Sequence, residues 1–358
     1  MDDTISYKCP CCGGTLVWNS TKQKMVCEYC DNEFTEEQMD ELSAEEEQKT
    51  AEPEMNWNVS DSGESGGQME HMKVHICQSC GGEIIGDENS VATQCVYCGS
   101  PTILTENISG VNRPNYVIPF QLDKKKAKAA LQDFYKGKRL LPNSFAKENH
   151  IDKISGVYVP FWLFDCDANA HITYDATKVR IWSDKNYDYT KTDHYLVTRA
   201  GEIGFEKIPV DGSSKMADNY MDAIEPFDYS QMTEFSPNFL SGYFADKYDV
   251  DAKESIPRAN NRVKNSTEQA FADTVRGYEA VTPRTTHINV ENGDANYTMF
   301  PVWMLNTKYQ GKNYSFAMNG QTGKMVGELP TDKGKFWGYL LGISAAVFAV
   351  AQLAVFLI

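Results

Sequence analysis

Eight of the ten cysteines fall in four CxxC pairs, and in a reducing compartment thiols at this spacing are metal ligands and not disulfide partners. Two pairs form each set, and fourteen residues separate the pairs within each set. A tight CxxC turn directs two thiolates at one ion, and a second CxxC from a neighbouring hairpin completes a tetrahedron. The sequence therefore predicts two zinc ribbons, one with the ligands Cys9, Cys12, Cys27 and Cys30, the other with Cys77, Cys80, Cys95 and Cys98.

Four protein ligands fill the coordination sphere of Zn²⁺, so no position remains for water, and each ion is expected to be structural. It would also supply folding free energy that a segment of about 25 residues cannot obtain from core burial. Iron in a rubredoxin-like site and a redox dithiol are the alternatives. Both first pairs run directly into Gly-Gly, which indicates a duplicated ribbon, and duplication of all four ligands argues against the dithiol.

The two remaining cysteines are not expected to be ligands or nucleophiles. Cys11 lies inside the first CxxC and could replace a ligand, but the spacing from Cys9 to Cys12 is the one that the second ribbon repeats. Cys166 stands between Asp165 and Asp167, whose carboxylates would raise the pKa of its thiol. We therefore interpret Cys166 as a half-buried small residue in a strand.

No motif for catalysis or nucleotide binding is present in the sequence, which therefore predicts no enzyme and no small-molecule substrate. There is no HExxH, GxSxG or GxxxxGK[ST] motif and no Rossmann glycine pattern. Gly-Gln-Thr-Gly-Lys at 320–324 lacks the P-loop spacing and is predicted to be a hairpin turn. The histidines show no metal-binding spacing; they are His71, His75, His150, His171, His194 and His287.

Charge separates the N-terminal part from the rest of the chain. The formal net charge is −16, and residues 1–75 hold 17 acidic against 5 basic side chains, which leaves 33 against 29 in the remainder. Phosphate neutralisation by Lys and Arg supplies most non-specific nucleic-acid affinity, so this acidic part is poorly suited to grip DNA or RNA. The first residues also show no basic stretch followed by an apolar stretch, which is the pattern of a signal peptide. This favours the cytoplasm over secretion.

The pattern along the chain predicts an α+β protein with two N-terminal zinc ribbons. We expect ribbon 1 at 1–35, an acidic helix and flexible linker at 36–72, ribbon 2 at 73–105, an α+β domain at 112–330 and a transmembrane helix at 336–358. The acidic helix begins with the capping box Thr35-x-x-Gln38.

Three helices are predicted inside the α+β domain. One runs from 124 to 136, with Asp123 as its cap and Gly137 at its end, and it buries Ala127, Leu131 and Phe134. The others are expected at 237–248, capped by Ser236 with Pro237 in the first position, and at 258–276.

Similarity between two segments suggests an internal duplication within the domain. Residues 157–174 and 298–316 each hold Pro-x-Trp followed by two apolar residues and then an alternating, aromatic-rich strand. We interpret them as two related β-meanders. Their tryptophans, Trp162 and Trp303, are expected to be core anchors in preference to ligand-stacking rings.

Residues 336–358 contain no charged side chain, and as a helix of ~1.5 Å per residue they would cross a hydrocarbon core of ~30 Å. Lys333 and Lys335 precede this segment, as is typical of a cytoplasmic boundary, so the N-terminal bulk is expected on the cytoplasmic side. A buried core helix is the alternative. Gly338, Gly342 and Ala346 form a small-residue face that permits helix packing, although the motif is frequent by chance.

A basic cluster at 124–139 contains Lys124, Lys125, Lys126, Lys128, Lys136, Lys138 and Arg139. The sequence favours a solvated helix face there over contact with anionic lipid headgroups.

Several segments together resemble a known bacterial family: CPxCGG-type ribbons, KGKRLLPNSF, GVYVPFWLFD, FPVW, NGQTGKMVGE and the closing apolar helix. The chain is similar to the YdjG-like zinc-ribbon membrane proteins, often labelled TFIIB-type zinc ribbon protein or PriA-like helicase. This resemblance implies a membrane-anchored cytoplasmic protein that recruits PspA-like or SPFH-type membrane-stress partners, without enzyme activity. The helicase label is not supported by these residues, because they contain no nucleotide-binding loop.

Three functional hypotheses follow. The first is a non-enzymatic membrane-anchored adaptor or scaffold that contacts the lipid bilayer and protein partners. The second is a nucleic-acid-binding ribbon protein of replication or transcription, which the acidic setting opposes. The third is a membrane-bound enzyme, which would need a polar cleft with perturbed titratable groups.

Overall fold

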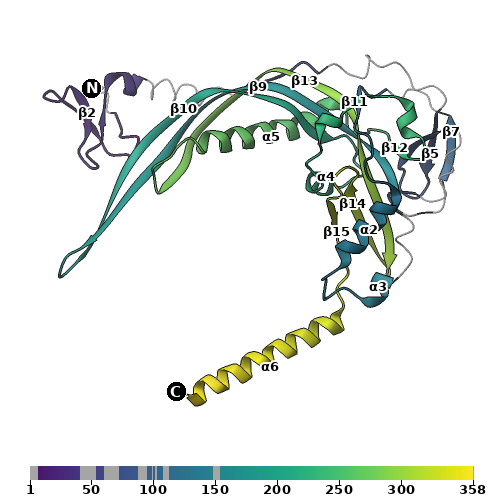
Figure 1. Ribbon diagram of the computed structural model, residues 1–358. Helices are drawn as coiled ribbons and strands as arrows, with labels where there is room; N and C mark the ends of the chain where they lie inside the picture. Colours follow the sequence, from purple (N-terminus) through teal and green to yellow (C-terminus); the bar gives the residue numbers. More distant parts are fainter. Residues whose placement is uncertain are drawn as a thin grey trace. The chain divides into compact units, whose positions relative to one another are not determined.

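The computed structural model describes residues 7–40, 54–59, 72–87, 95–98, 100, 103–107, 113–147 and 154–357, and it is an α+β structure with a large sheet (Figure 1). The strands are β1 (Leu16–Asn19), β2 (Lys24–Cys27), β3 (Glu33–Phe34), β4 (Met55–Trp57), β5 (Met72–Cys77), β6 (Glu83–Asp87), β7 (Ile103–Asn107), β8 (Tyr116–Val117), β9 (Ser155–Ser183), β10 (Asp188–Asp211), β11 (Thr233–Glu234), β12 (Phe244–Asp246), β13 (Ala280–Tyr309), β14 (Lys312–Asn319) and β15 (Met325–Gly327). The helices are α2 (Lys124–Tyr135), α3 (Asn143–Lys147), α4 (Asp218–Ala223), the 3₁₀ turns η2 (Tyr229–Gln231) and η3 (Pro237–Leu240), α5 (Ala252–Ala272) and α6 (Lys333–Leu357).

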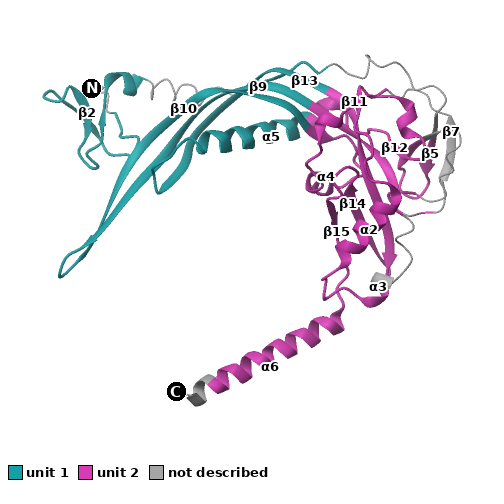
Figure 2. Ribbon diagram, in the orientation of Figure 1, with its two compact units in different colours: residues 1–59, 164–208, 256–295 teal, residues 60–163, 209–255, 296–358 magenta. Residues whose placement is uncertain are grey.

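The chain divides into two compact units, coloured separately in Figure 2. Unit 1 comprises residues 1–59, 164–208 and 256–295, and unit 2 comprises residues 60–163, 209–255 and 296–358. The strands β9, β10 and β13 each contribute residues to both units. The first predicted ribbon belongs to unit 1 and the second belongs to unit 2.

The sheet of unit 2 includes the strands of the second ribbon. β5 pairs with β6 and with β7 in antiparallel fashion, and β6 continues into β12, where Asp246 lies opposite Ile84. β12 in turn runs parallel to the start of β9, with Ala245 opposite Tyr158. The ribbon hairpin is therefore hydrogen-bonded, through β12, to the central strands of the domain.

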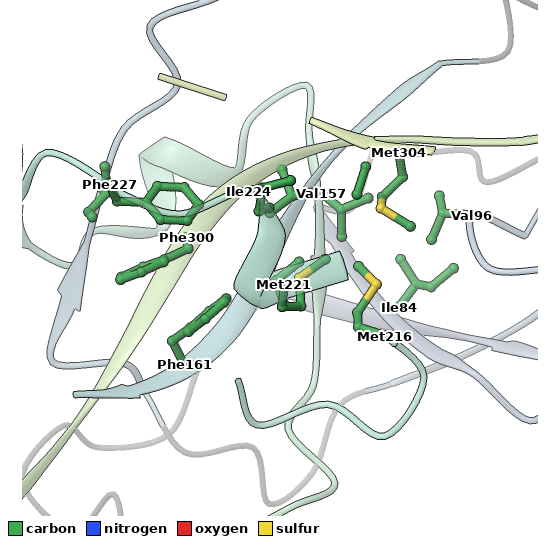
Figure 3. Packing of buried hydrophobic residues seen from close by; sticks show 14 of the residues in the cluster. Ile84, Val96, Val157, Phe161, Met216, Met221, Ile224, Phe227, Phe300 and Met304 are labelled. Carbon is green, nitrogen blue, oxygen red and sulfur yellow. The ribbon is translucent and has the colours of Figure 1, made fainter. Parts of the chain in front are cut away.

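One hydrophobic core supports this arrangement (Figure 3). Phe161 of β9 stacks on Phe300 of β13 with ring centroids 4.3 Å apart, and Ile84 and Val96 of the second ribbon belong to the same buried cluster. A side chain of this size contributes about 1.5–3 kcal/mol when it is fully buried. Figure 3 also labels Val157, Met216, Met221, Ile224, Phe227 and Met304 around them.

The two Pro-x-Trp segments occupy comparable places, as core anchors. Trp162 and Trp303 are both buried, and each indole N–H donates to a backbone carbonyl at 3.0 Å, of Val250 and of Leu122 respectively. Strands β9 and β13 that carry them are neighbours in one sheet. The prediction of core anchors is confirmed, whereas duplication of the domain stays a prediction.

Unit 1 contains a strand within the segment that was expected to be a flexible linker. Residues 55–57 form β4, which runs parallel to β13. Trp57 packs edge-on against Phe164 at 5.2 Å and its indole N–H donates to Asn260 of α5 at 2.8 Å. Composition missed this strand because Trp57 lies in a polar stretch, is only partly buried, and makes its contacts with residues about 100 and 200 positions further along the chain.

The helices partly follow the sequence prediction. Asp123 caps α2 by accepting from the Lys126 N–H, and Ala127, Leu131 and Tyr135 are buried, so Tyr135 takes the place expected for Phe134. The capping box is present as well: Thr35 N donates to Gln38 Oε1 at 2.9 Å, and Gln38 N to Thr35 Oγ1 at 3.3 Å. The remainder of that acidic helix lies outside the described residues.

The helix predicted for 237–248 is wrong beyond its first turn. Ser236 caps a single 3₁₀ turn, η3, and Gly242 then adopts a φ of +81°, which ends the helical path. The following residues form β12 between β6 and β9. The helix expected at 258–276 is α5, which begins six residues earlier, at Ala252, and ends at Ala272.

The C-terminal helix α6 is long and apolar enough to cross a membrane, and its residues 336–353 are all exposed. Its start is capped by Asp332, whose carboxylate accepts from the Lys335 N–H at 3.0 Å. The buried-core-helix alternative does not fit this exposure.

Candidate metal centres

The eight predicted ligands form two clusters of four sulfur atoms, and within each cluster all four atoms lie within 4.8 Å of one another. In the first, Cys9 Sγ stands 3.6 Å from Cys30 Sγ, and Cys12 Sγ 3.4 Å from Cys27 Sγ. In the second cluster the corresponding distances are 3.7 Å and 3.7 Å. Four thiolates bound tetrahedrally at ~2.3 Å from one ion stand about 3.8 Å apart, so both clusters fit one metal ion each.

The local backbone of each ribbon requires its Gly-Gly pair. Gly13 and Gly81 adopt φ values of +73° and +69°, which turn the chain directly after the first CxxC. At the next position a Cβ atom on Gly14 would stand 2.6 Å from Cδ2 of Tyr29, and one on Gly82 would stand 2.6 Å from Cδ2 of Tyr97. The first glycine is therefore a turn requirement, and the second makes room for the tyrosine inside the second CxxC.

Backbone N–H groups around each cluster favour the thiolate form of one ligand. Burial acts to raise the pKa of Cys27, but hydrogen bonds from the backbone of Tyr29 and Cys30, together with those from the thiols of Cys12 and Cys30, lower the pKa to about 7. Burial also acts to raise the pKa of Cys77. Hydrogen bonds from the backbone of Cys80 and Ser79 oppose this effect and help to lower the pKa to about 7. A deprotonated ligand at neutral pH is what metal capture requires.

The first ribbon is a small unit with an exposed apolar surface. β1, β2 and β3 form a three-stranded antiparallel sheet, and its core consists of Cys9, Leu16, Cys27 and Phe34. Outside this core, the side chains of Trp18 and Tyr29 are 46% and 80% exposed. A core of four residues is too small to hold a fold without the metal.

The second ribbon, in contrast, is built into unit 2. Cys77 and Cys95 are buried and belong to the same hydrophobic cluster as Phe161 and Phe300. Asn306 of β13 donates its amide to the carbonyl of Val96 inside the second CxxC. Lys247, next to β12, pairs with Glu83 of β6 at 3.1 Å. The two clusters share their ligand geometry but not their surroundings.

A buried carboxyl group lies beside the second ribbon. Asp246 of β12 is 1% exposed, and the Ser213 hydroxyl donates to its carboxylate. Burial raises the pKa of Asp246 to about 7, against the lowering effect of Ser213 and of the Tyr97 hydroxyl. Burial and the neighbouring Asp246 also raise the pKa of Tyr97 well above its ordinary value. Sequence reasoning did not single out Asp246, because the strand that buries it was predicted to be helix.

The two remaining cysteines, Cys11 and Cys166, are not part of either cluster. Cys166 is 4% exposed, more buried than expected, and burial followed by Asp167 and Asp165 raises the pKa of its thiol to about 11. The flanking carboxylates thus act in the predicted direction. Cys11 is half-buried, and burial raises the pKa of its thiol too.

A cavity of about 320 Å³ opens beside the second ribbon in unit 2. Its charged side chains are Lys215 and Glu328, and Met216 and Met304 supply part of its apolar wall. Burial raises the pKa of Tyr220 in the same wall. The Gly-Gln-Thr-Gly-Lys segment does not contribute to it: this segment forms the predicted turn between β14 and β15, where Asn319 Oδ1 accepts from the backbone of Gln321 and Thr322.

A second exposed aromatic group, which the sequence did not reveal, lies at the β9–β10 turn of unit 1. Trp182 stacks on Tyr189 with ring centroids 5.4 Å apart and planes at 9°. Asp184 holds the turn by accepting from the backbone of Asn186 and Tyr187, each at 2.8 Å. Trp182 is 49% exposed, close to the exposed fraction of Trp18.

Comparison with known proteins places the chain in a family. No protein-family model and no solved structure matches it. The chain is 32% identical over 349 residues to YdjG of Bacillus subtilis (strain 168), which is described as an uncharacterized protein. The match covers 98% of this chain and 97% of that protein. With this identity over nearly the full length of both proteins, the chain belongs to the YdjG family.

Proposed function

We propose that this chain is a non-enzymatic, membrane-anchored adaptor. In this proposal α6 crosses the membrane with the N-terminal bulk in the cytoplasm, a structural zinc ion holds each ribbon, and the first ribbon binds a protein partner. The resemblance to YdjG-like proteins suggests PspA-like or SPFH-type partners.

The observation that carries the adaptor proposal is the different setting of the two clusters. Both have the same ligand spacing, yet Cys77 and Cys95 serve the core of unit 2, while the first cluster holds a small sheet with exposed Trp18 and Tyr29. Tryptophan and tyrosine are the side chains most enriched among residues that dominate binding energy at protein interfaces. The first ribbon therefore suits protein contact better than the second.

Zinc is proposed because four cysteine thiolates in a closed tetrahedral set are its usual structural site. When bound, the ion supplies folding free energy and no reaction. Backbone N–H groups at Cys27 and Cys77 support the thiolates, and Gly14 and Gly82 let each tyrosine close over its ribbon.

Affinity purification of the full-length chain from detergent-solubilised membranes tests the adaptor role. A Trp18→Ser, Tyr29→Ser double variant should lose at least about tenfold of its co-purified partner, because each such anchor contributes about 2 kcal/mol or more at an interface. Trp182→Ser is the matched control, since Trp182 is an equally exposed tryptophan on another hairpin of unit 1. Metal analysis of all variants should still give two ions per chain.

Two results would contradict this role. One is unchanged partner recovery with the double variant. The other is loss of the partner with Trp182→Ser alone, which would move the interface to the β9–β10 turn.

A further inference from the structure

The start of α6 is fixed to the loop that follows α2, although about 190 residues separate them in sequence. The backbone N–H of Asp332 donates to the carbonyl of Leu140 at 2.8 Å. The Lys335 ammonium donates to the carbonyl of Leu141 at 2.6 Å and to Asn143 Oδ1 at 2.7 Å. All of these residues belong to unit 2, so the position of the helix start beside this loop is set by direct contacts.

These contacts gather basic side chains around the start of α6. Lys136, Lys138 and Arg139 directly precede Leu140 and are exposed, and Lys333 is exposed in the first turn of α6. We call these four residues the basic collar. The loop has a defined shape, because Gly137 adopts a φ of +75° and the Leu141 N–H donates to the Lys138 carbonyl at 3.0 Å.

Local charges leave the collar positive. Residues 133–143 and 328–339 together hold five basic and three acidic side chains, a net charge of +2, in a chain whose net charge is −16. Asp133 pairs with Lys136, and Asp332 is engaged in capping α6. The Lys138 ammonium lies 5.3 Å from the centroid of the Phe134 ring, which leaves it charged.

Exposed aromatic rings follow directly. Phe336, Trp337 and Tyr339 are all exposed in the first two turns of α6. Aromatic side chains at the ends of a span reside at the level of the lipid headgroups, and basic side chains within a Debye length of an anionic membrane surface are attracted to it.

We infer that the basic collar binds the headgroups of anionic phospholipids around the point where α6 enters the membrane. This inference rests on the proposed membrane anchor and adds to it a lipid class and a site. Only the C-terminal end of the basic cluster takes part, because Lys124, Lys125 and Lys126 lie at the opposite end of α2.

Quenching of tryptophan fluorescence by brominated lipids tests the collar in the full-length chain. The protein is reconstituted in vesicles of equal phosphatidylglycerol and phosphatidylcholine content, with bromine on the acyl chains of one lipid or of the other. The difference between the wild type and Trp337→Phe isolates the signal of Trp337. We expect phosphatidylglycerol to quench Trp337 more strongly, with a relative association of at least about fivefold, the equivalent of ~1 kcal/mol.

Two variants with three substitutions each locate the effect. Lys136→Gln, Lys138→Gln and Arg139→Gln together should bring the ratio close to one. Lys124→Gln, Lys125→Gln and Lys126→Gln together remove the same charge from the start of α2 and should leave the ratio unchanged. Equal quenching by the two lipids in the wild type, or a ratio that the collar variant does not change, overturns the inference. Either result leaves the proposal that α6 crosses the membrane intact. If neither lipid quenches Trp337, the anchor and the collar both fail.

Discussion

The ring of Tyr97 lies against Gly82 so closely that a Cβ atom at position 82 would stand 2.6 Å from its Cδ2 atom. Gly14 and Tyr29 stand in the same relation, at the same distance, in the first ribbon. The two tyrosines differ in their freedom to move. Tyr29 is 80% exposed, whereas Tyr97 packs against the core of unit 2.

This difference predicts unequal effects of one substitution. Gly82→Ala should destabilise the protein by about 1–3 kcal/mol, because the ring of Tyr97 packs against the core of unit 2 and can move away from position 82 only by losing that packing. Gly14→Ala should cost less than about 1 kcal/mol, since the ring of Tyr29 can rotate into solvent. Thermal unfolding of both variants, with metal content measured in parallel, checks the prediction. Equal losses in the two variants would contradict the assigned difference between the ribbons.

Loss of a ligand should also have different consequences in the two clusters. Cys77→Ser and Cys9→Ser should each remove one metal ion from the full-length protein. Cys77 lies in the core that contains Phe161 and Phe300, so its replacement should expose much of unit 2 to protease. Cys9 shares a core with three other buried residues, so its replacement should expose the first ribbon alone.

Mass spectrometry of the protease fragments distinguishes these outcomes. Cleavage confined to residues near 7–40 in both variants would show that the second ion does not support unit 2. A metal-free Cys9→Ser protein would show that the two clusters do not bind independently.

The buried Asp246 predicts a pH dependence of stability. Its pKa is about 7 in the folded protein, against an ordinary value of 3.8. Between these values the unfolded chain has lost the proton and the folded protein retains it, so the unfolded state binds fewer protons. Stability should therefore fall as pH rises from about 4 to about 7 and change little above that, by an amount on the order of 4 kcal/mol in total.

Asp246→Asn isolates this contribution. An asparagine oxygen can still accept from the Ser213 hydroxyl, and the groups that face it, Tyr97, Tyr297 and Asp249, are left in place. Urea unfolding at pH 5, 6, 7 and 8 should show that the wild type loses stability relative to the variant as pH rises to 7. A constant difference across this range would mean that Asp246 is already ionised in the folded protein at pH 5.

The sequence was sufficient to predict the metal ligands but not the packing around each cluster. The CxxC spacing identified both sulfur clusters, because metal ligation imposes a local pattern. Tyr29 and Tyr97 occupy the same place in that pattern, yet one is exposed and the other packs on a core whose strands, β9 and β13, begin about 60 and about 180 residues further along the chain.

Long-range strand pairing also explains the errors in the predicted secondary structure. Ser236 and Pro237 are genuine helix-start signals, and they produce one 3₁₀ turn. Continuation of the helix was precluded by Gly242 and by the hydrogen bonds that residues 244–246 make with β6 and β9. Helix signals are local, whereas a strand between two others is determined by its neighbours.

Membrane fractionation with alkaline carbonate extraction tests the anchored adaptor most directly, because every partner contact that we propose depends on this location. The full-length chain should stay in the membrane pellet after carbonate treatment. A Val347→Asp, Val350→Asp variant should be released, since charges at the middle of a span cost ~2.5–3.5 kcal/mol each. Recovery of the wild-type chain in the soluble fraction would contradict the account.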